Sequence, residues 1–336
     1  MFKEFMAETN KDKQQVILSG MQPTGALHIG NYEGALKNWV ELQDQYQMYC
    51  CIVDWHALTA DYENPGILRE RIFEVAVDFM AGGLDPEKCA IFIQSDVKEH
   101  LELHWIFSTL ISVPTVMRLP TYQEKKDNLD SYAFLGYPVL QAADICVYNA
   151  DKVPVGKDQE KHIWLASDLA KRFNHYYGPT LKEPEGLFRE IPLILGSDNR
   201  KMSKSYDNHI PMGFTPEETQ KRIKTFYTDE KKLRKGDPGR PEQCPVYLLH
   251  RIYTEKAKET IAPPCKTGEL GCADCKKRLT ENLNKAMEPV REKRSELLKQ
   301  PDHIWDVLEE GGNKARERAR SVMDKVRTAM KMNYRK

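Results

Sequence analysis

The chain has 336 residues, of which 40% are hydrophobic and 30% are charged, the balance of a folded protein long enough for two domains. Its 50 Lys and Arg residues are matched by 50 Asp and Glu residues, so the formal net charge is +0. Neutrality excludes a uniformly basic protein that coats nucleic acid and leaves room only for regional contacts. No apolar run reaches the roughly 20 residues that span a bilayer, and Met1 to Lys13 lacks a signal-peptide pattern. We therefore expect a cytoplasmic protein that has neither a membrane nor DNA as a partner.

The first two hundred residues alternate β-rich runs with amphipathic helical patterns. The candidate strands are 15–19, 48–53, 90–94 and 152–155. Helical periodicity covers 32–45, 67–80, 101–110 and 159–173. Strands that alternate with helices predict an α/β fold with a doubly wound, parallel, Rossmann-like sheet. Such a sheet binds ligands beyond the carboxyl ends of its strands.

The strand signal fades after about residue 206, and helical patterns follow. Thr215, Pro216 and Glu218 form a helix start, with a capping residue, a proline at the first helical position and an acidic first turn. In the last segment, 314–330, small and apolar residues recur along one helical face. We therefore expect an α/β domain at 1–206, a smaller helical domain at 207–310, and a C-terminal helix at 311–336 that packs back on the body.

Two motifs in the α/β part carry chemistry. After the first strand, a loop of glycine and proline leads to His28-Ile29-Gly30-Asn31 at the entry of a helix, where backbone N–H groups can bind phosphate. Near the end of this part, Lys201-Met202-Ser203-Lys204-Ser205 places two lysines on a short loop suited to gripping a polyphosphate. A group that binds the transition state more tightly is worth about 3–4 kcal/mol. Taken singly, the first is also typical of an ordinary glycine loop and the second of a solvated turn.

Together and in this order, the two motifs resemble those of the class I aminoacyl-tRNA synthetases. Further segments resemble the tryptophanyl-tRNA synthetases over nearly the whole chain: 19–25, 28–32, 52–57, 122–125, 137–144 and 153–159. The resemblance implies a homodimeric enzyme that activates L-tryptophan with ATP and Mg²⁺ and transfers it to tRNA(Trp). It assigns 1–206 to catalysis and 207–310 to anticodon binding. Two alternatives stay open, a tyrosyl-tRNA synthetase and a synthetase-like RNA-binding paralogue.

The resemblance also implies roles for individual residues. Those with catalytic roles would be His28, Lys125, Lys201 and Lys204. Those in contact with ATP would be Gln22, Pro23, Thr24, Gly30, Asn31, Gly156, Lys157, Asp158, Ile194, Lys201, Met202, Ser203, Lys204 and Ser205. Asp144 would accept the indole N–H of tryptophan, and the residues around the substrate would be Tyr137, Gln141, Gln159 and His56. Gln141 and Lys157 depart from residues common in the family.

The eight cysteines fall into two groups. Cys50, Cys51, Cys89 and Cys146 lie in apolar runs and are expected in the core. The second group lies in a polar stretch, separated by twenty, six and two residues: Cys244, Cys265, Cys272 and Cys275. Four thiolates suit either Zn²⁺ or a [4Fe–4S] cluster, and spacing alone does not choose between them. The segment resembles that of a bacterial subset of tryptophanyl-tRNA synthetases that hold a [4Fe–4S] cluster, so the resemblance favours the cluster.

Basic residues surround the second cysteine group. They are Lys221, Arg222, Lys224, Lys231, Lys232, Arg234, Lys235, Lys276, Lys277 and Arg278. Most such runs are solvated helix faces, but here the resemblance places them in the anticodon-binding part, so we expect tRNA contacts.

Overall fold

The computed structural model describes residues 14–125, 131–188, 194–232, 234 and 236–334, without the side chains of Thr121, Glu124, Lys125 and Asp158. The chain forms two compact units. The first contains Met1–Gly25, Asn38–Glu190 and Gln300–Lys336, and the second contains Ala26–Lys37 and Ile191–Lys299. The division therefore falls before the Lys201–Ser205 loop rather than at residue 206, and residues 26–37 group with the later part of the chain.

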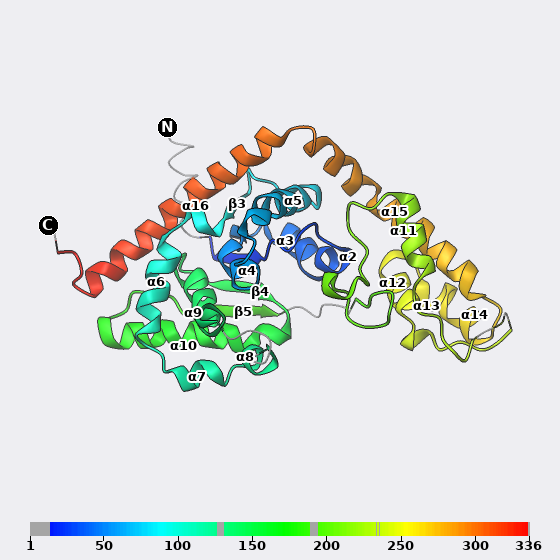
Figure 1. Ribbon diagram of the computed structural model, residues 1–336, viewed down its shortest axis with the longest axis horizontal. Coiled ribbons are helices and arrows are strands. Elements are labelled where there is room, and N and C mark those ends of the chain that lie inside the picture. The colour runs from blue at the N-terminus through cyan, green and yellow to red at the C-terminus, as the bar shows by residue number, and fades with distance from the viewer. Residues whose placement is uncertain (1–13, 126–130, 189–193, 233, 235, 335–336) are drawn as a thin grey trace. The chain divides into compact units, whose positions relative to one another are not determined.

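A five-stranded parallel sheet organises the first unit (Figure 1). Its strands are β1 (Val16–Met21), β2 (Gln47–Ile52), β3 (Cys89–Ile93), β4 (Lys152–Val155) and β5 (Glu185–Phe188), in the order β3-β2-β1-β4-β5. The doubly wound α/β prediction is confirmed. The sequence missed β5, because its four residues contain no β-branched side chain and are not fully buried.

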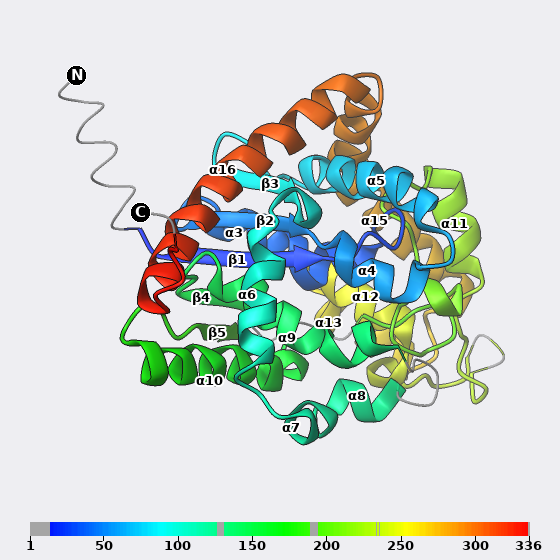
Figure 2. The same ribbon diagram turned by 60° about the vertical axis from the view of Figure 1, so that its left-hand side comes forward.

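Helices cover both faces of this sheet (Figure 2). On one face lie α3 (Lys37–Leu42) and α5 (Leu68–Ala81), whose Trp39 and Phe79 rings meet at 5.5 Å between centroids. On the other lie α9 (Tyr132–Cys146) and α10 (Glu160–Tyr177). The remaining helical segments are α4 (Asp54–Asp61), η2 (Pro65–Ile67), η3 (Gln94–Asp96), α6 (Glu99–Ser108), α7 (Val113–Met117), α8 (Pro120–Lys125) and η4 (Lys157–Gln159). The four cysteines expected in the core are all buried.

The long helix α16 (Pro301–Ala329) closes the edge of the sheet at β3 (Figure 1). Its small and apolar face is buried, with Ala315 and Ala319 fully enclosed, as the periodicity of 314–330 predicts. Arg327 pairs with Glu102 of α6. Covering an edge strand in this way removes a row of unpaired backbone groups that would otherwise attract another chain.

The second unit is helical in the residues described. Its elements are α2 (Ile29–Asn31), the π-helical turn η1 (Tyr32–Leu36), η5 (Lys204–Tyr206), α11 (Pro216–Lys224), η6 (Pro241–Gln243), α12 (Pro245–Tyr253), α13 (Ala257–Thr260), α14 (Ala262–Lys266) and α15 (Cys272–Leu297). The predicted helix start at Thr215 is confirmed, because Thr215 and Glu218 form a reciprocal capping box. Tyr253 donates to Glu33 at 2.9 Å and so ties α12 to η1. Among the described residues, none of the helices is long and apolar enough to cross a membrane.

Candidate active site

The His28–Asn31 motif begins a helix through a capping box of its own. The backbone N–H of Asn31 donates to Nδ1 of His28 at 3.2 Å, and the backbone N–H of His28 donates to Oδ1 of Asn31 at 3.2 Å. Because Nδ1 accepts, a neutral His28 carries its proton on Nε2. Burial, with His209 and the two loop lysines, lowers the pKa of His28 from 6.5 to about 3. His28 therefore offers a neutral N–H donor at ordinary pH.

Gly30 is required by close packing around His28. A Cβ on Gly30 would lie 2.8 Å from Cε1 of His28 and 3.5 Å from Cβ of Met202. The same segment pairs with the chain that follows the lysine loop, since Ile29 N donates to Ile210 O and Met212 N donates to Leu27 O. The two sequence motifs are therefore brought together within the second unit.

Asn208 organises the Lys201–Ser205 loop, although it lies outside the motif. Its side chain is 1% exposed, accepts from Ser203 N at 2.7 Å, and donates to Asp198 Oδ1 at 2.6 Å and to Lys201 O at 3.1 Å. Against the effect of desolvation, hydrogen bonds from Asn208 and Arg200 lower the pKa of Asp198 to about 2. Met202 N donates to Ile194 O at 2.9 Å. Ile194, the predicted contact of the adenine ring, is therefore hydrogen-bonded to the lysine loop.

Asp144 lies in a buried polar network of the first unit. Its Oδ2 is 2.7 Å from Nε2 of His56, and its Oδ1 is 2.6 Å from Nδ1 of His100 and 2.8 Å from Nε2 of Gln94. Burial alone would raise the pKa of Asp144, but His56 and His100 hold it below its ordinary value. His56 and Gln94 follow the carboxyl ends of the neighbouring strands β2 and β3, where a doubly wound sheet binds ligands.

The other predicted contacts of the first unit fall into two groups. Gln22, Pro23 and Thr24 follow β1, and Gly156, Lys157 and Asp158 follow β4, so both loops leave the carboxyl ends of adjacent strands. Tyr137 makes edge contacts with His56 and His162. Gln159 Oε1 is 2.8 Å from His162 Nδ1, and Gln141 is half-buried on α9. Lys125 ends α8, and its side chain, like that of Asp158, lies outside the described residues.

Sequence reasoning missed His100, Gln94, Tyr148 and Asn208. None of them belongs to the motifs that carry the resemblance. His100, Gln94 and Tyr148 act through contacts with residues 44 to 50 positions away, whereas Asn208 bonds to residues within ten positions. His100 directly precedes the helical pattern at 101–110, and it is fully buried on α6.

Comparison with known proteins agrees with this geometry. The profile of the family "tRNA synthetases class I (W and Y)" matches residues 10–288. A tryptophan–tRNA ligase of Thermotoga maritima is 43% identical over 95% of this chain and 99% of its own length. The chain belongs to the tryptophan–tRNA ligase family of class I synthetases.

Two further relatives extend the match. A tryptophan–tRNA ligase of Aquifex aeolicus is 38% identical over 94% of this chain and 99% of its own length. A crystal structure of the tryptophanyl-tRNA synthetase of Campylobacter jejuni, complexed with ADP and tryptophan, superposes with a TM-score of 0.85 at 34% identity and covers 94% of this chain and 99% of that one. The helical C-terminal region belongs to the same fold, and the enzyme class is that of an aminoacyl-tRNA ligase.

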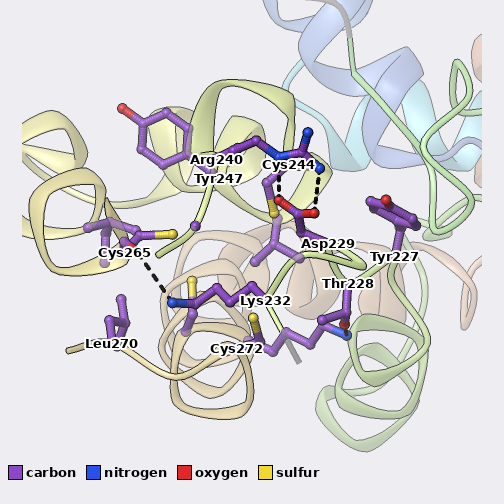
Figure 3. A pocket seen from close by; sticks show the side chains of 15 residues that line it. Tyr227, Thr228, Asp229, Lys232, Arg240, Cys244, Tyr247, Cys265, Leu270 and Cys272 are labelled. Atoms are coloured by element: carbon purple, nitrogen blue, oxygen red, sulfur yellow. Dashed lines mark hydrogen bonds and ion pairs between the residues drawn. The ribbon is translucent and has the colours of Figure 1, made fainter. Parts of the chain in front are cut away.

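The ligase also has a cysteine-lined cavity in its second unit (Figure 3). Cys244 precedes α12, Cys265 lies in α14, and Cys272 and Cys275 occupy the first turn of α15. All four line one cavity with about 480 Å³ of empty space, including its open mouth. Within the described residues, however, no three His, Cys, Asp or Glu side chains converge closely enough to hold one metal ion.

Two of the basic residues expected to contact tRNA, the buried Lys232 and the half-buried Lys276, line this cavity. Lys232 is 4% exposed and donates to the carbonyl oxygens of Asp237 and Cys265. Lys276 donates to the carbonyl oxygens of Lys224 and Phe226. A third, Arg222 on α11, lies outside the cavity lining and pairs with Asp207. Three of the basic residues expected to contact tRNA are therefore engaged within the protein.

Proposed function

We propose that the chain activates L-tryptophan with ATP and transfers it to tRNA(Trp) in the cytoplasm. Family membership makes it an aminoacyl-tRNA ligase. The observation that carries the ATP-dependent step is the pairing of the His28 segment with the chain after the Lys201–Ser205 loop. In that arrangement a neutral N–H donor and two cationic side chains belong to one compact unit.

The proposed ATP contacts follow from what each group can donate. His28 Nε2–H and the lysines 201 and 204 suit phosphate oxygens, and Gly30 keeps the main chain open to the nucleotide. Mg²⁺ would enter with ATP as the counter-ion of its phosphates. The further contacts that we propose are Lys125, Gln22, Pro23, Thr24, Asn31, Gly156, Lys157, Asp158, Ile194, Met202, Ser203 and Ser205.

The proposed tryptophan contacts centre on Asp144. An ionised carboxylate in a buried setting accepts the indole N–H strongly, and a site built for a polar atom rejects analogues that lack it. His56 fixes the carboxylate, and Tyr137 supplies an aromatic wall beside it. Gln141 and Gln159 offer amide oxygens for the substrate ammonium group.

The reaction proceeds without a covalent enzyme intermediate. A carboxylate oxygen of tryptophan attacks the α-phosphorus of ATP, and the bond from that phosphorus to pyrophosphate breaks. The charge that moves onto pyrophosphate is stabilised by the loop lysines and His28. A hydroxyl of the terminal tRNA adenosine then attacks the acyl carbon, AMP leaves, and the hydroxyl proton passes to solvent.

We further propose that the four cysteines bind a [4Fe–4S] cluster rather than Zn²⁺. The support from the structure is that all four cysteines line one cavity. Four thiolates suit either Zn²⁺ or a cluster, and the resemblance to the cluster-binding subset favours the cluster. Gly239 supports a close-packed sulfur environment, since a Cβ there would lie 2.5 Å from Cys265 Sγ. When bound, the cluster would cross-link α12, α14 and α15 and take no part in the reaction.

Metal analysis tests this proposal. Protein purified without oxygen should contain four iron atoms and four sulfide ions per chain, and the double variant Cys272→Ala, Cys275→Ala should lose them. Cys146→Ala, which changes a buried core cysteine, is the matched control and should keep its iron. Stoichiometric zinc in place of iron would contradict the proposal.

We propose a homodimer, as the resemblance implies, and the first unit offers candidate interface residues. Trp105 on α6 is 69% exposed and Val113 on α7 is 55% exposed, and Leu101 and Met117 of the same two helices are exposed as well. Contiguous exposed apolar patches can mark an interface, so Trp105 is the residue chosen for the test. Trp105→Glu should yield a monomer in light scattering, and an unchanged dimer would place the interface elsewhere.

Charging of tRNA(Trp) with tryptophan tests the function itself. Lys204→Ala should lower the charging rate by about 10²–10³ because it removes a transition-state contact, whereas Lys325→Ala, exposed on α16, should not change it. If Lys204→Ala binds tRNA normally and the unmodified chain never charges it, an RNA-binding paralogue is the correct alternative.

A further inference from the structure

Hydrogen-bond donors from the protein occupy most of the acceptor positions on the Asp144 carboxylate. A carboxylate accepts about four hydrogen bonds, two on each oxygen. Oδ1 is filled by His100 Nδ1 at 2.6 Å and Gln94 Nε2 at 2.8 Å. Oδ2 is 2.7 Å from His56 Nε2. Among the described residues, one acceptor site on Oδ2 is therefore left, and Asp144 is 4% exposed.

The orientation of His100 is fixed at both ring nitrogens. An ionised carboxylate only accepts, so Nδ1 of His100 must carry the proton whether the ring is neutral or charged. Nε2 lies 2.8 Å from the hydroxyl of Tyr148. Both residues are fully buried, and the Tyr148 ring stacks on Tyr49 at 4.8 Å. A flipped His100 ring would lose both hydrogen bonds, so the donor to Asp144 stays in place.

Gln94 is oriented in the same way. Its Oε1 accepts from the backbone N–H of Trp55 at 3.1 Å, which leaves its Nε2 to donate to Asp144. An exchanged amide would place an oxygen against a carboxylate oxygen. The two donors on Oδ1 therefore come from side chains that cannot easily turn.

We propose that His100 and Gln94 are positioning residues that lock Asp144 so that Oδ2 alone accepts from the substrate. This rests on the proposed role of Asp144 as acceptor of the indole N–H. With Oδ1 occupied, the carboxylate can neither rotate nor take a water molecule on that oxygen. An indole N–H supplies one donor at one position and matches the single open site. His100 thus acts on specificity through Asp144, without touching the substrate.

Pyrophosphate exchange with two substrates tests the proposal. The substrates are tryptophan and the analogue in which sulfur replaces the indole N–H. In the unmodified enzyme, kcat/KM should strongly favour tryptophan. His100→Phe should raise the KM for tryptophan by about 10- to 100-fold, the range expected for a hydrogen bond to a charged group. It should reduce the preference over the analogue and leave the KM for ATP unchanged.

Two further variants separate positioning from general structural damage. In His100→Asn the amide can still donate to Asp144, so most of the preference should return. Tyr148→Phe keeps every ring in place and removes one hydroxyl, so it should shift the KM for tryptophan in the same direction but less. Cys146→Ala, a buried change on α9, is the control for lost packing and should alter neither ratio.

The outcomes separate an error in the role of Asp144 from an error in the role of His100. If the unmodified enzyme does not prefer tryptophan over the sulfur analogue, the proposed role of Asp144 is wrong. If that preference exists and Asp144→Asn abolishes it, but folded His100→Phe and Tyr148→Phe both keep it with an unchanged KM, the positioning role is wrong and the role of Asp144 stands. If His100→Phe does not fold, Tyr148→Phe and His100→Asn decide the question.

Discussion

His28 shows how one residue can be held in a single protonation state. Its Nδ1 accepts from the backbone of Asn31, its ring lies 5.7 Å from that of His209, and burial lowers its pKa to about 3. A charged imidazole would carry a proton on Nδ1 and lose the cap of α2. The neutral ring therefore keeps both the helix start and a proton on Nε2.

Because folded His28 stays neutral, the stability of the protein should depend on pH. Because the folded pKa of His28, about 3, lies below the unfolded value of 6.5, the unfolded chain takes up the proton first as the pH falls. Stability from His28 is therefore complete above pH 6.5 and declines below it. Urea unfolding at pH 7.5, 6.5 and 5.5 should show the unmodified protein losing stability relative to His28→Gln as the pH falls. A difference that stays constant over this range would contradict the assigned state.

Asn208 is expected to hold the Lys201–Ser205 loop in a conformation that binds ATP. Asn208→Ala removes the side-chain partner of Ser203 N and Lys201 O, at about 1 kcal/mol for each of these part-buried hydrogen bonds. The lysine loop should loosen, and the KM for ATP in pyrophosphate exchange should rise by roughly tenfold or more. Asn174→Ala is the matched control, because Asn174 organises the 180–181 loop through three comparable hydrogen bonds. An equal rise in the KM for ATP in Asn174→Ala would show that Asn208 has no specific effect on ATP binding.

Helices with local signals were predictable from sequence, and those shaped by distant contacts were not. The capping box at Thr215 depends only on residues within one turn, so its sequence pattern was sufficient. The helix expected at 32–45 contains instead the π-helical turn η1, and the Tyr253 hydroxyl donates to Glu33 within it. No pattern within 32–45 reports that contact, which joins positions far apart in the chain.

Two adjacent glycines on α16 provide an internally controlled test of packing. A Cβ on Gly311 would lie 1.9 Å from the carbonyl oxygen of Ile91, whereas one on Gly312 would meet Asp96 Cβ at 3.6 Å, an ordinary contact. Gly312→Ala should therefore stabilise the helix by about 0.5–1 kcal/mol. Gly311→Ala should destabilise the protein by about 1–3 kcal/mol. Denaturant unfolding measures both, and a stabilising Gly311→Ala would show that α16 does not pack closely on β3.

At the scale of the whole molecule, the parallel sheet was predictable because the β-rich runs alternate with helices. The division into units was not, since residues 26–37 join the second unit through partners such as Ile210 and Tyr253. In the candidate site, too, local motifs were predictable and contacts between distant residues were not. Motif residues such as His28 and Lys204 could be named from the sequence, whereas His100 could be found only once the fold brought it to Asp144.

ATP–pyrophosphate exchange with tryptophan, tyrosine and phenylalanine, on protein purified without oxygen, tests the proposed function most directly. We expect exchange with tryptophan and none above background with the other two amino acids. Phenylalanine has no polar ring atom for Asp144, and tyrosine carries its donor at a different position. Exchange with tyrosine but not tryptophan, or no exchange from a folded sample, would contradict the assignment of Asp144 and of tryptophan as the substrate.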